Sequence, residues 1–267
     1  MSTGIVPAIS RGEVRGGEVG STASVLLSAL KLVLVAIHTV ILAPVVVALA
    51  VLDQRAGYRI CQLWVRLNLL IYGLRVRATR LAPLDPSLAH VFMSNHRSQL
   101  DILAMVKALE DFQLRWVAKV ELTRVPLFGW ALKHSGHIII DRRNHVQAIA
   151  SLRTARTKML EGVSVMIFPE GTRATLDGPL LPFKKGGFML ALETGFPIVP
   201  IAVRGSGELL PRGSWQPASG EIEVIVGAPI PVEGVDRDEL IERVRAFMVA
   251  QLGARAGTAD PPTAAAL

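Results

Sequence analysis

His96 and Asp101 stand five residues apart in a polar stretch, Ser94 to Asp101, and an imidazole paired with a carboxylate can remove a proton from an alcohol. Five residues on a continuous helix correspond to about 140° of rotation, so the two side chains would not share a helix face. The pairing therefore requires His96 in a loop and Asp101 in the first turn of the next helix. Ser98 is a suitable N-cap, which puts Asp101 at the third helical position.

The same stretch also has a purely structural interpretation. Ser98 and Asp101 have the spacing of a capping box, and Asn95 with His96 could form a hydrogen-bonded turn. In that case the carboxylate would bind backbone amides only, and the imidazole would have no orienting partner.

A second polar stretch, Phe-Pro-Glu-Gly-Thr-Arg at residues 168–173, lies at the end of the apolar run 163–168, which predicts a strand. Gly171 permits a tight turn, and Arg173 can bind a phosphate through two parallel hydrogen bonds. Lys184 precedes a predicted helix, and helix N-termini favour anions. These features predict a phosphate cradle, although an ordinary polar turn with solvated lysines has the same composition.

Short β-rich runs alternate with helical runs from about residue 79, which predicts an α/β fold with a mainly parallel central sheet flanked by helices. The predicted strands are 90–94, 116–118, 137–140, 163–168, 198–203 and 222–226, and the predicted helices are 99–109, 126–133, 145–160, 187–193 and 237–249. Both polar stretches follow predicted strands, which is where α/β folds place their sites.

Residues 24–52 are almost wholly apolar and long enough to cross a bilayer, and they are too long for the core of a signal peptide. Residues 60–74 form a shorter amphipathic patch with an aromatic residue and an arginine toward each end, typical of a helix in the headgroup region. Residues 53–58 would form the turn between them. The sequence leaves open whether one helix spans the membrane or a helical hairpin enters one leaflet.

Six arginines at positions 55–80 follow the long apolar segment, so the positive-inside rule places the rest of the chain on the cytoplasmic side of the cell membrane. We expect a flexible tail at residues 1–20, membrane-associating helices at 21–78, an α/β domain at 79–253 and a disordered tail at 254–267.

The chain has 267 residues, a formal net charge of +7 and 51% hydrophobic residues. This charge, beside a long apolar segment, favours a membrane surface or a phosphorylated substrate as partner. We expect no nucleic-acid binding, because no basic run is interleaved with aromatic residues and no zinc-finger spacing is present. Cys61 is the single cysteine, which excludes an internal disulfide, and His134 with His137 lacks an acidic neighbour to complete a metal site.

Several short motifs, in this order, resemble those of the glycerolipid acyltransferase family, in particular the 1-acylglycerol-3-phosphate acyltransferases. They are Asn95-His96-x4-Asp101, Lys119, Pro126-Leu-Phe-Gly-Trp130, Gly136-His-Ile-Ile-Ile-Asp141-Arg142, Phe168-Pro-Glu-Gly-Thr-Arg173 and Ile198-Val-Pro-Ile-Ala202. The similarity covers roughly residues 90–205, and residues 79–253 would then form the acyltransferase domain.

The resemblance implies that His96 and Asp101 activate a hydroxyl that attacks an acyl thioester. It also implies substrate-binding roles for Asn95, Lys119, Arg142, Glu170, Gly171, Thr172, Arg173 and Lys184. The expected reaction moves a fatty acyl group from acyl-CoA or acyl carrier protein to the sn-2 hydroxyl of lysophosphatidic acid, giving phosphatidic acid in phospholipid biosynthesis. The expected partners are membrane lipid, the lysophospholipid acceptor and the acyl donor, with no metal or other cofactor.

Two other functions remain open. A membrane hydrolase or thioesterase could use His96 to activate water, and a non-enzymatic module could bind anionic lipid through the arginine-rich segment. Thiol release from a thioester, measured with and without lysolipid, distinguishes the three functions.

Overall fold

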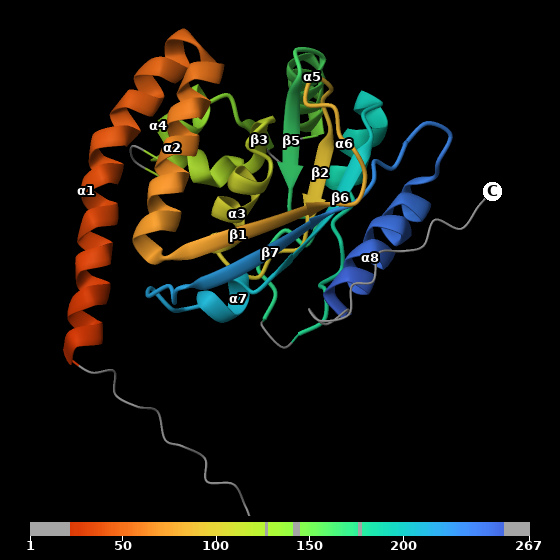
Figure 1. Cartoon of the computed structure of the whole chain (residues 1–267). Helices are drawn as coiled ribbons and strands as arrows, with labels where there is room; N and C mark the ends of the chain where they lie inside the picture. Colours follow the sequence, from red (N-terminus) through yellow and green to blue (C-terminus); the bar gives the residue numbers. More distant parts are fainter. Residues whose placement is uncertain (1–21, 126–127, 141–144, 176–177, 254–267) are drawn as a thin grey trace, which may run out of the picture.

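The computed structural model describes residues 22–125, 128–140, 145–175 and 178–253 (Figure 1). The two predicted tails, 1–20 and 254–267, and Arg142 lie outside these ranges. The expected membrane segment is described from Thr22, where its helix begins.

In the described part of the chain, seven strands form one sheet in the order β1-β7-β6-β2-β5-β3-β4. The strands are β1 (Leu74–Arg80), β2 (Val91–Ser94), β3 (Gln113–Lys119), β4 (Ile138–Ile140), β5 (Val163–Ile167), β6 (Ile198–Arg204) and β7 (Gly220–Val226). All neighbouring pairs are parallel except β6 with β7. The predicted mainly parallel α/β sheet is therefore confirmed.

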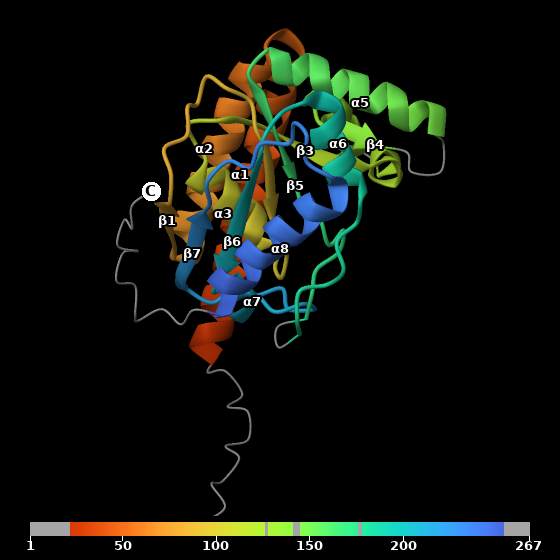
Figure 2. The same ribbon diagram turned by 90° about the vertical axis from the view of Figure 1, so that its right-hand side faces the viewer.

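Helices cover both faces of the sheet (Figures 1 and 2). One face carries α2 (Gln54–Tyr72) and α3 (Leu100–Ala108), and the other carries α5 (His145–Leu160), α6 (Gly186–Thr194) and α8 (Arg237–Gly253). The remaining helices are α1 (Thr22–Leu52), the 3-10 helix η1 (Val120–Arg124), α4 (Phe128–His134) and α7 (Ser206–Leu209).

Successive residues of the central strands alternate between the two faces. On β2, Phe92 belongs to the hydrophobic cluster under α2 and α3, whereas Val91 and Met93 belong to the cluster under α5, α6 and α8. Because both faces are covered, β2 is apolar on both sides and is completely buried, as parallel strands in α/β folds usually are. This rigid centre carries the polar loop that follows Ser94.

The region between the apolar helix and β2 differs from the sequence prediction. The expected turn at 53–58 is a single N-cap residue, Asp53, whose carboxylate accepts the N–H of Arg55 at 2.8 Å, and α2 begins at Gln54. The helix ends at Tyr72, before Gly73 in the left-handed conformation (φ 68°). The predicted helical segment, which continued to Leu74, is therefore too long, because Gly73 terminates the helix.

Strand β1 was not predicted, and it lies across the expected boundary between residues 78 and 79. Its sequence, Leu-Arg-Val-Arg-Ala-Thr-Arg, alternates apolar and polar residues, which is the pattern of a half-buried strand. The arginines were instead interpreted as interfacial cations. Arg77 faces outward, where it pairs with Glu221 and Glu223 of the neighbouring β7.

Helix α1 lies antiparallel against α2, and its first turns extend beyond the end of α2 (Figure 1). Trp64 Nε1 donates a hydrogen bond to Thr39 Oγ1 at 2.8 Å, and a Cβ added at Gly57 would lie 2.7 Å from the Cβ of Ala50. Residues Val25–Leu52 are apolar and long enough to cross a membrane, and they are mostly exposed in the isolated chain. The two helices form a hairpin beside the domain.

Candidate active site

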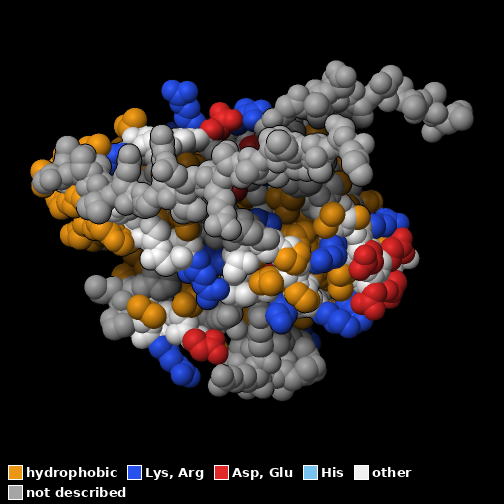
Figure 3. Space-filling model, turned by 90° about the horizontal axis from the view of Figure 1, so that it is seen from below, with side chains coloured by type: hydrophobic (Ala, Val, Ile, Leu, Met, Phe, Trp, Pro, Cys, Tyr) orange, Lys and Arg blue, Asp and Glu red, His pale blue; other side chains and the backbone are white. Residues whose placement is uncertain are grey.

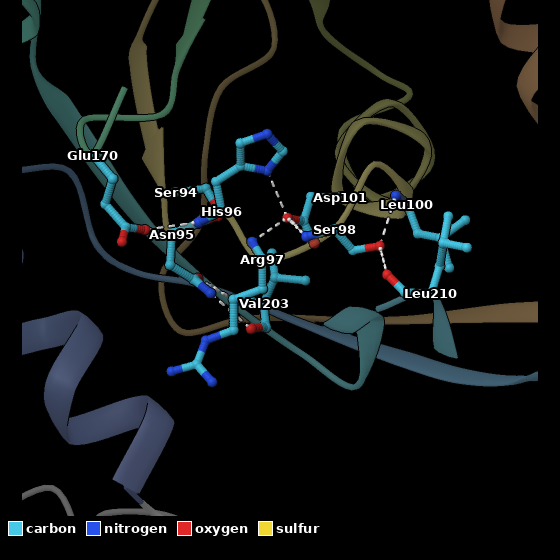
Figure 4. Close-up of polar contacts among 10 residues, drawn as sticks. All are labelled: Ser94, Asn95, His96, Arg97, Ser98, Leu100, Asp101, Glu170, Val203 and Leu210. Atoms are coloured by element: carbon cyan, nitrogen blue, oxygen red, sulfur yellow. Dashed lines mark hydrogen bonds and ion pairs between the residues drawn. The ribbon is translucent and has the colours of Figure 1, made fainter. Parts of the chain in front are cut away.

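His96 lies in the loop between β2 and α3, and Asp101 lies in the first turn of α3 (Figure 4). His96 Nδ1 is 2.7 Å from Asp101 Oδ2, and the exposed fractions of the two side chains are 15% and 0%. The structure thus brings the pair together in the arrangement that the five-residue spacing requires. The imidazole is partly open to solvent, while the carboxylate that orients it is buried.

The carboxylate of Asp101 also caps the loop. Its Oδ2 atom accepts the backbone N–H groups of Arg97 and Ser98 at 2.8 and 2.9 Å, in addition to the imidazole. Because this oxygen accepts three hydrogen bonds, the proton of the neutral His96 ring is on Nδ1, which leaves the Nε2 lone pair free. The structural and catalytic interpretations of the stretch therefore coexist.

Helix α3 begins one residue later than predicted, although the side chain of Ser98 still caps its first turn. The N-cap residue is Gln99, whose side chain makes no capping hydrogen bond, so Asp101 is the second helical residue rather than the third. Ser98 Oγ accepts the N–H of Leu100 at 3.2 Å, which is a capping hydrogen bond, and donates to the carbonyl of Leu210 at 2.9 Å. The hydroxyl thus ties the loop to the segment after α7, a contact that local spacing could not reveal.

Asn95 is completely buried and joins β2 to β6. Its Nδ2 donates to the carbonyl of Val203 at 3.0 Å, and its Oδ1 accepts the N–H of Val203 at 2.7 Å (Figure 4). Both polar groups of the amide are therefore used within the protein. The side chain of Asn95 thus anchors the start of the loop that carries His96, and its role in substrate binding stays a prediction.

Glu170 is also buried, with 1% of the residue exposed. One carboxylate oxygen accepts the N–H of His96 at 2.9 Å, and the other accepts the N–H of Leu181 at 2.9 Å. Burial raises the pKa of Glu170, and the two N–H donors oppose that rise. Glu170 faces inward and holds the backbone of the loop that carries His96, and its role in substrate binding stays a prediction.

The segment after β5 is joined to the loop after β2 by further hydrogen bonds. Ala174 N donates to the carbonyl of His96 at 2.8 Å, and Arg97 Nη2 donates to the carbonyl of Gly178 at 3.0 Å. With Glu170, these contacts hold the two polar stretches side by side at the carboxyl edge of the sheet.

The other residues that were predicted to bind substrate differ in their exposure and in their contacts. Gly171 adopts a left-handed turn with φ 70°, Thr172 and Lys184 are exposed, and Arg173 is half-buried. Neither Arg173 nor Lys184 has a side-chain hydrogen bond or ion pair with any residue that the structure describes, so both are available to an anion. Lys119 ends β3 opposite Ile140, which puts its backbone at the same edge.

Figure 3 views the molecule from the side toward which β2 and β5 point in Figure 1. Lysine and arginine side chains are scattered over the middle of this face with hydrophobic side chains between them, further hydrophobic side chains gather on the side of α1, and acidic side chains gather at the opposite side. Cations beside an apolar surface suit a lipid with an anionic headgroup.

One cavity lies between β1 and the C-terminal end of α3, and another lies at the amino ends of β3 and β5. Their volumes are about 440 and 500 Å³, and Asp111 lines both. Neither cavity is lined by His96 or by any of the predicted site residues. Within the described residues, no group of three or more His, Cys, Asp and Glu side chains could hold a metal ion.

Comparison with known proteins gives consistent matches. A family model described as Acyltransferase matches residues 75–204. A 1-acyl-sn-glycerol-3-phosphate acyltransferase of Pseudomonas aeruginosa is 35% identical over 192 residues, which cover 69% of this chain and 72% of that protein. The human 1-acyl-sn-glycerol-3-phosphate acyltransferase alpha is 37% identical over 183 residues, or 67% of this chain; the match spans only 64% of the human protein.

A similar fold occurs in the crystal structure of the 1-acyl-sn-glycerophosphate (LPA) acyltransferase PlsC from Thermotoga maritima. The TM-score is 0.68 at 24% sequence identity, and the match covers 88% of this chain and 98% of that chain. At this identity the likeness concerns the fold alone.

Proposed function

The chain belongs to the glycerolipid acyltransferase family, and we propose that it moves a fatty acyl group from a thioester donor to the sn-2 hydroxyl of lysophosphatidic acid, giving phosphatidic acid. The observation that carries this proposal is the pairing of His96 Nδ1 with the buried carboxylate of Asp101 at 2.7 Å. It leaves one basic nitrogen at the partly open edge of the site, where the oxygen of an alcohol can approach.

In the proposed reaction, Nε2 of His96 takes the proton of the acceptor hydroxyl as its oxygen attacks the thioester carbonyl. The carbon–sulfur bond then breaks, the thiolate of the donor leaves, and the proton on the imidazolium passes to it. Asp101 stabilises the imidazolium between these steps. General-base assistance of this kind accelerates a reaction by about 10²- to 10⁴-fold. No protein nucleophile and no metal take part in these steps.

We propose that the acceptor phosphate binds Arg173, with Lys184 and Lys119 as further cations. The guanidinium of Arg173 has no partner among the described residues and follows the left-handed turn at Gly171. A planar guanidinium matches two phosphate oxygens, whereas the ammonium of Lys184 supplies a point charge. Together they would select a lysolipid with a phosphate headgroup over one without.

We further propose that α1 and α2 attach the enzyme to one leaflet as a hairpin. Lys31 Nζ lies 3.4 Å from Ser219 Oγ, so the first half of α1 lies next to the sheet domain. A helix that crossed the bilayer would carry this half away from the domain. The acceptor could then enter laterally from the leaflet, while acyl-CoA or acyl carrier protein arrives from the cytoplasm.

The test is an assay of the purified protein with acyl-CoA and acyl carrier protein donors against a panel of lysolipids. The proposal predicts thiol release that depends on the acceptor and formation of phosphatidic acid from lysophosphatidic acid. Thiol release without any acceptor would indicate a hydrolase. Lipid binding with no thiol release under any condition would indicate a non-enzymatic module.

A further inference from the structure

The imidazole of His96 is stacked on an aromatic ring. The ring centroids of His96 and Phe168 are 3.9 Å apart, and their planes differ by 7°. The ring of Trp116 in turn lies 5.5 Å from that of Phe168, with an interplanar angle of 30°. The three rings come from the loop after β2, the end of β5 and β3, so the sheet itself sets their spacing.

This contact adds a constraint that Asp101 alone does not supply. A single hydrogen bond to Nδ1 fixes one atom of the imidazole and leaves the ring free to tilt about that contact. Stacking on Phe168 fixes the plane of the ring. The direction of the Nε2 lone pair, which must meet the acceptor proton, is defined when both constraints act together.

The stack also distinguishes the two charge states of His96. The face of an aromatic ring carries partial negative charge, so it attracts a cation placed over it more strongly than a neutral group. His96 becomes a cation when it takes the acceptor proton. Phe168 therefore stabilises the imidazolium formed during the reaction more than the neutral base that precedes it, which lowers the barrier instead of merely improving binding.

We propose that Phe168 is a positioning residue, which holds the plane of the His96 imidazole and favours its protonated form during acyl transfer. This inference rests on the proposed acyltransferase function and adds a residue to it. The other charged groups around the imidazole, Asp101 on α3, Glu170 after β5 and Arg97 in the same loop, do not touch its face in the way Phe168 does. We expect them to keep their hydrogen bonds when Phe168 is changed, because none of these bonds involves Phe168.

The test compares Phe168→Leu with Phe168→Tyr, and uses Phe247→Leu as the control. Phe247 is half-buried on α8, where it packs beside Gly227 and Pro200, away from His96. Phe168→Leu should reduce kcat by about 3- to 30-fold, the range of a cation–π contact, and leave both KM values within about twofold. Phe168→Tyr should restore most of kcat, and Phe247→Leu should leave it unchanged.

A second readout detects the stack without turnover. In the NMR spectrum of the free protein, the ring current of Phe168 should move the ε1 proton signal of His96 upfield, and His96→Gln identifies that signal by its loss. The signal should move downfield in Phe168→Leu but not in Phe168→Tyr or Phe247→Leu. If the signal behaves this way but the parent protein transfers no acyl group, the proposed function fails while the stacked geometry stands.

Three results would overturn the inference: an unchanged kcat in Phe168→Leu, a rise in KM without a change in kcat, or a Phe168→Tyr variant as slow as Phe168→Leu. Melting temperatures should fall by similar amounts in Phe168→Leu and Phe247→Leu. A much larger fall in Phe168→Leu, with no recovery in Phe168→Tyr, would instead show that Phe168 only supports the fold.

Discussion

The Nδ1 atom of His96 and the Oδ2 atom of Asp101 lie 2.7 Å apart across the junction of β2 and α3. The same oxygen receives the N–H groups of Arg97 and Ser98. One carboxylate therefore shapes the loop and orients the imidazole, so loss of its charge and loss of its hydrogen bonds have separable consequences.

Asp101→Asn tests the charge. An asparagine can place its oxygen where Oδ2 lies and keep the loop folded, but a neutral amide no longer stabilises the imidazolium. We expect kcat to fall by about 10²- to 10⁴-fold, with a limited change in the melting temperature. Asp111→Asn, at the opposite edge, removes a carboxylate that pairs with Arg80 and should retain activity. Turnover of Asp101→Asn close to that of the parent would contradict the role of Asp101.

Asn95→Ala tests the link between β2 and β6. The substitution leaves the buried N–H and carbonyl of Val203 without their partners, which costs about 2 to 4 kcal/mol of unfolding free energy. Denaturant unfolding measures this loss, and the exposed Ser214→Ala provides the control. Unchanged stability combined with a raised KM for lysolipid would favour the predicted substrate-binding role of Asn95 over this structural one.

Glu170→Gln tests the buried carboxyl through the pH dependence of stability. Burial raises the pKa of Glu170 above its ordinary value of 4.5, so the folded protein binds this proton more readily than the unfolded chain. The contribution of Glu170 to stability is therefore fully present below about pH 4.5 and falls as the pH rises through the folded-state pKa.

The melting temperature of the parent minus that of Glu170→Gln should consequently decrease as the pH rises above about 4.5 toward neutrality. Melting curves at several pH values measure this difference, and the exposed Glu233→Gln gives the baseline. A difference that grows with pH would show that the hydrogen bonds from His96 and Leu181 outweigh burial, so that the pKa of Glu170 is lowered instead of raised.

Arg173→Ala tests the phosphate contact. Removal of a guanidinium that binds the acceptor phosphate should raise the KM for lysophosphatidic acid by about tenfold or more and leave the KM for the acyl donor nearly unchanged. The difference in rate between phosphate-bearing and neutral lysolipids should narrow. Arg243→Ala is the control, because Arg243 pairs with Glu239 on the exposed side of α8. An unchanged KM in Arg173→Ala would exclude this residue from the acceptor site.

A cysteine at Ser28 tests the hairpin. In a Cys61→Ala background, Ser28→Cys places a thiol in the first half of α1, and Ser214→Cys places one on the exposed surface of the domain. An impermeant maleimide should not label either variant from outside intact cells. Labelling of Ser28→Cys alone from outside would show that α1 crosses the membrane.

The sequence allowed most of the central sheet to be predicted, because buried parallel strands such as Val163–Ile167 are continuous apolar runs between turns. It failed at Leu74–Arg80, an edge strand with little burial whose arginines also fit an interfacial helix. Their partners, Glu221 and Glu223, lie on β7 about 145 residues away, so no local pattern could reveal the pairing.

The residues of the candidate site also separate into those that a local pattern could indicate and those whose partners lie far away in the sequence. The spacing of His96 and Asp101 offered their pairing as one of two interpretations, because both lie within one loop and one helical turn. The inward roles of Asn95 and Glu170 depend on Val203, His96 and Leu181, which come from other elements. The stack of His96 on Phe168 likewise joins two strand ends, and only the fold brings them together.

The most direct test of the proposed mechanism is the rate of acyl transfer by purified His96→Ala. Lysophosphatidic acid binding and the melting temperature are measured on the same sample. The mechanism predicts that transfer falls by at least about 10²-fold while lipid binding and folding persist, because the base that accepts the hydroxyl proton is gone. Near-normal acyl transfer by this variant would contradict the assignment of His96 as the base.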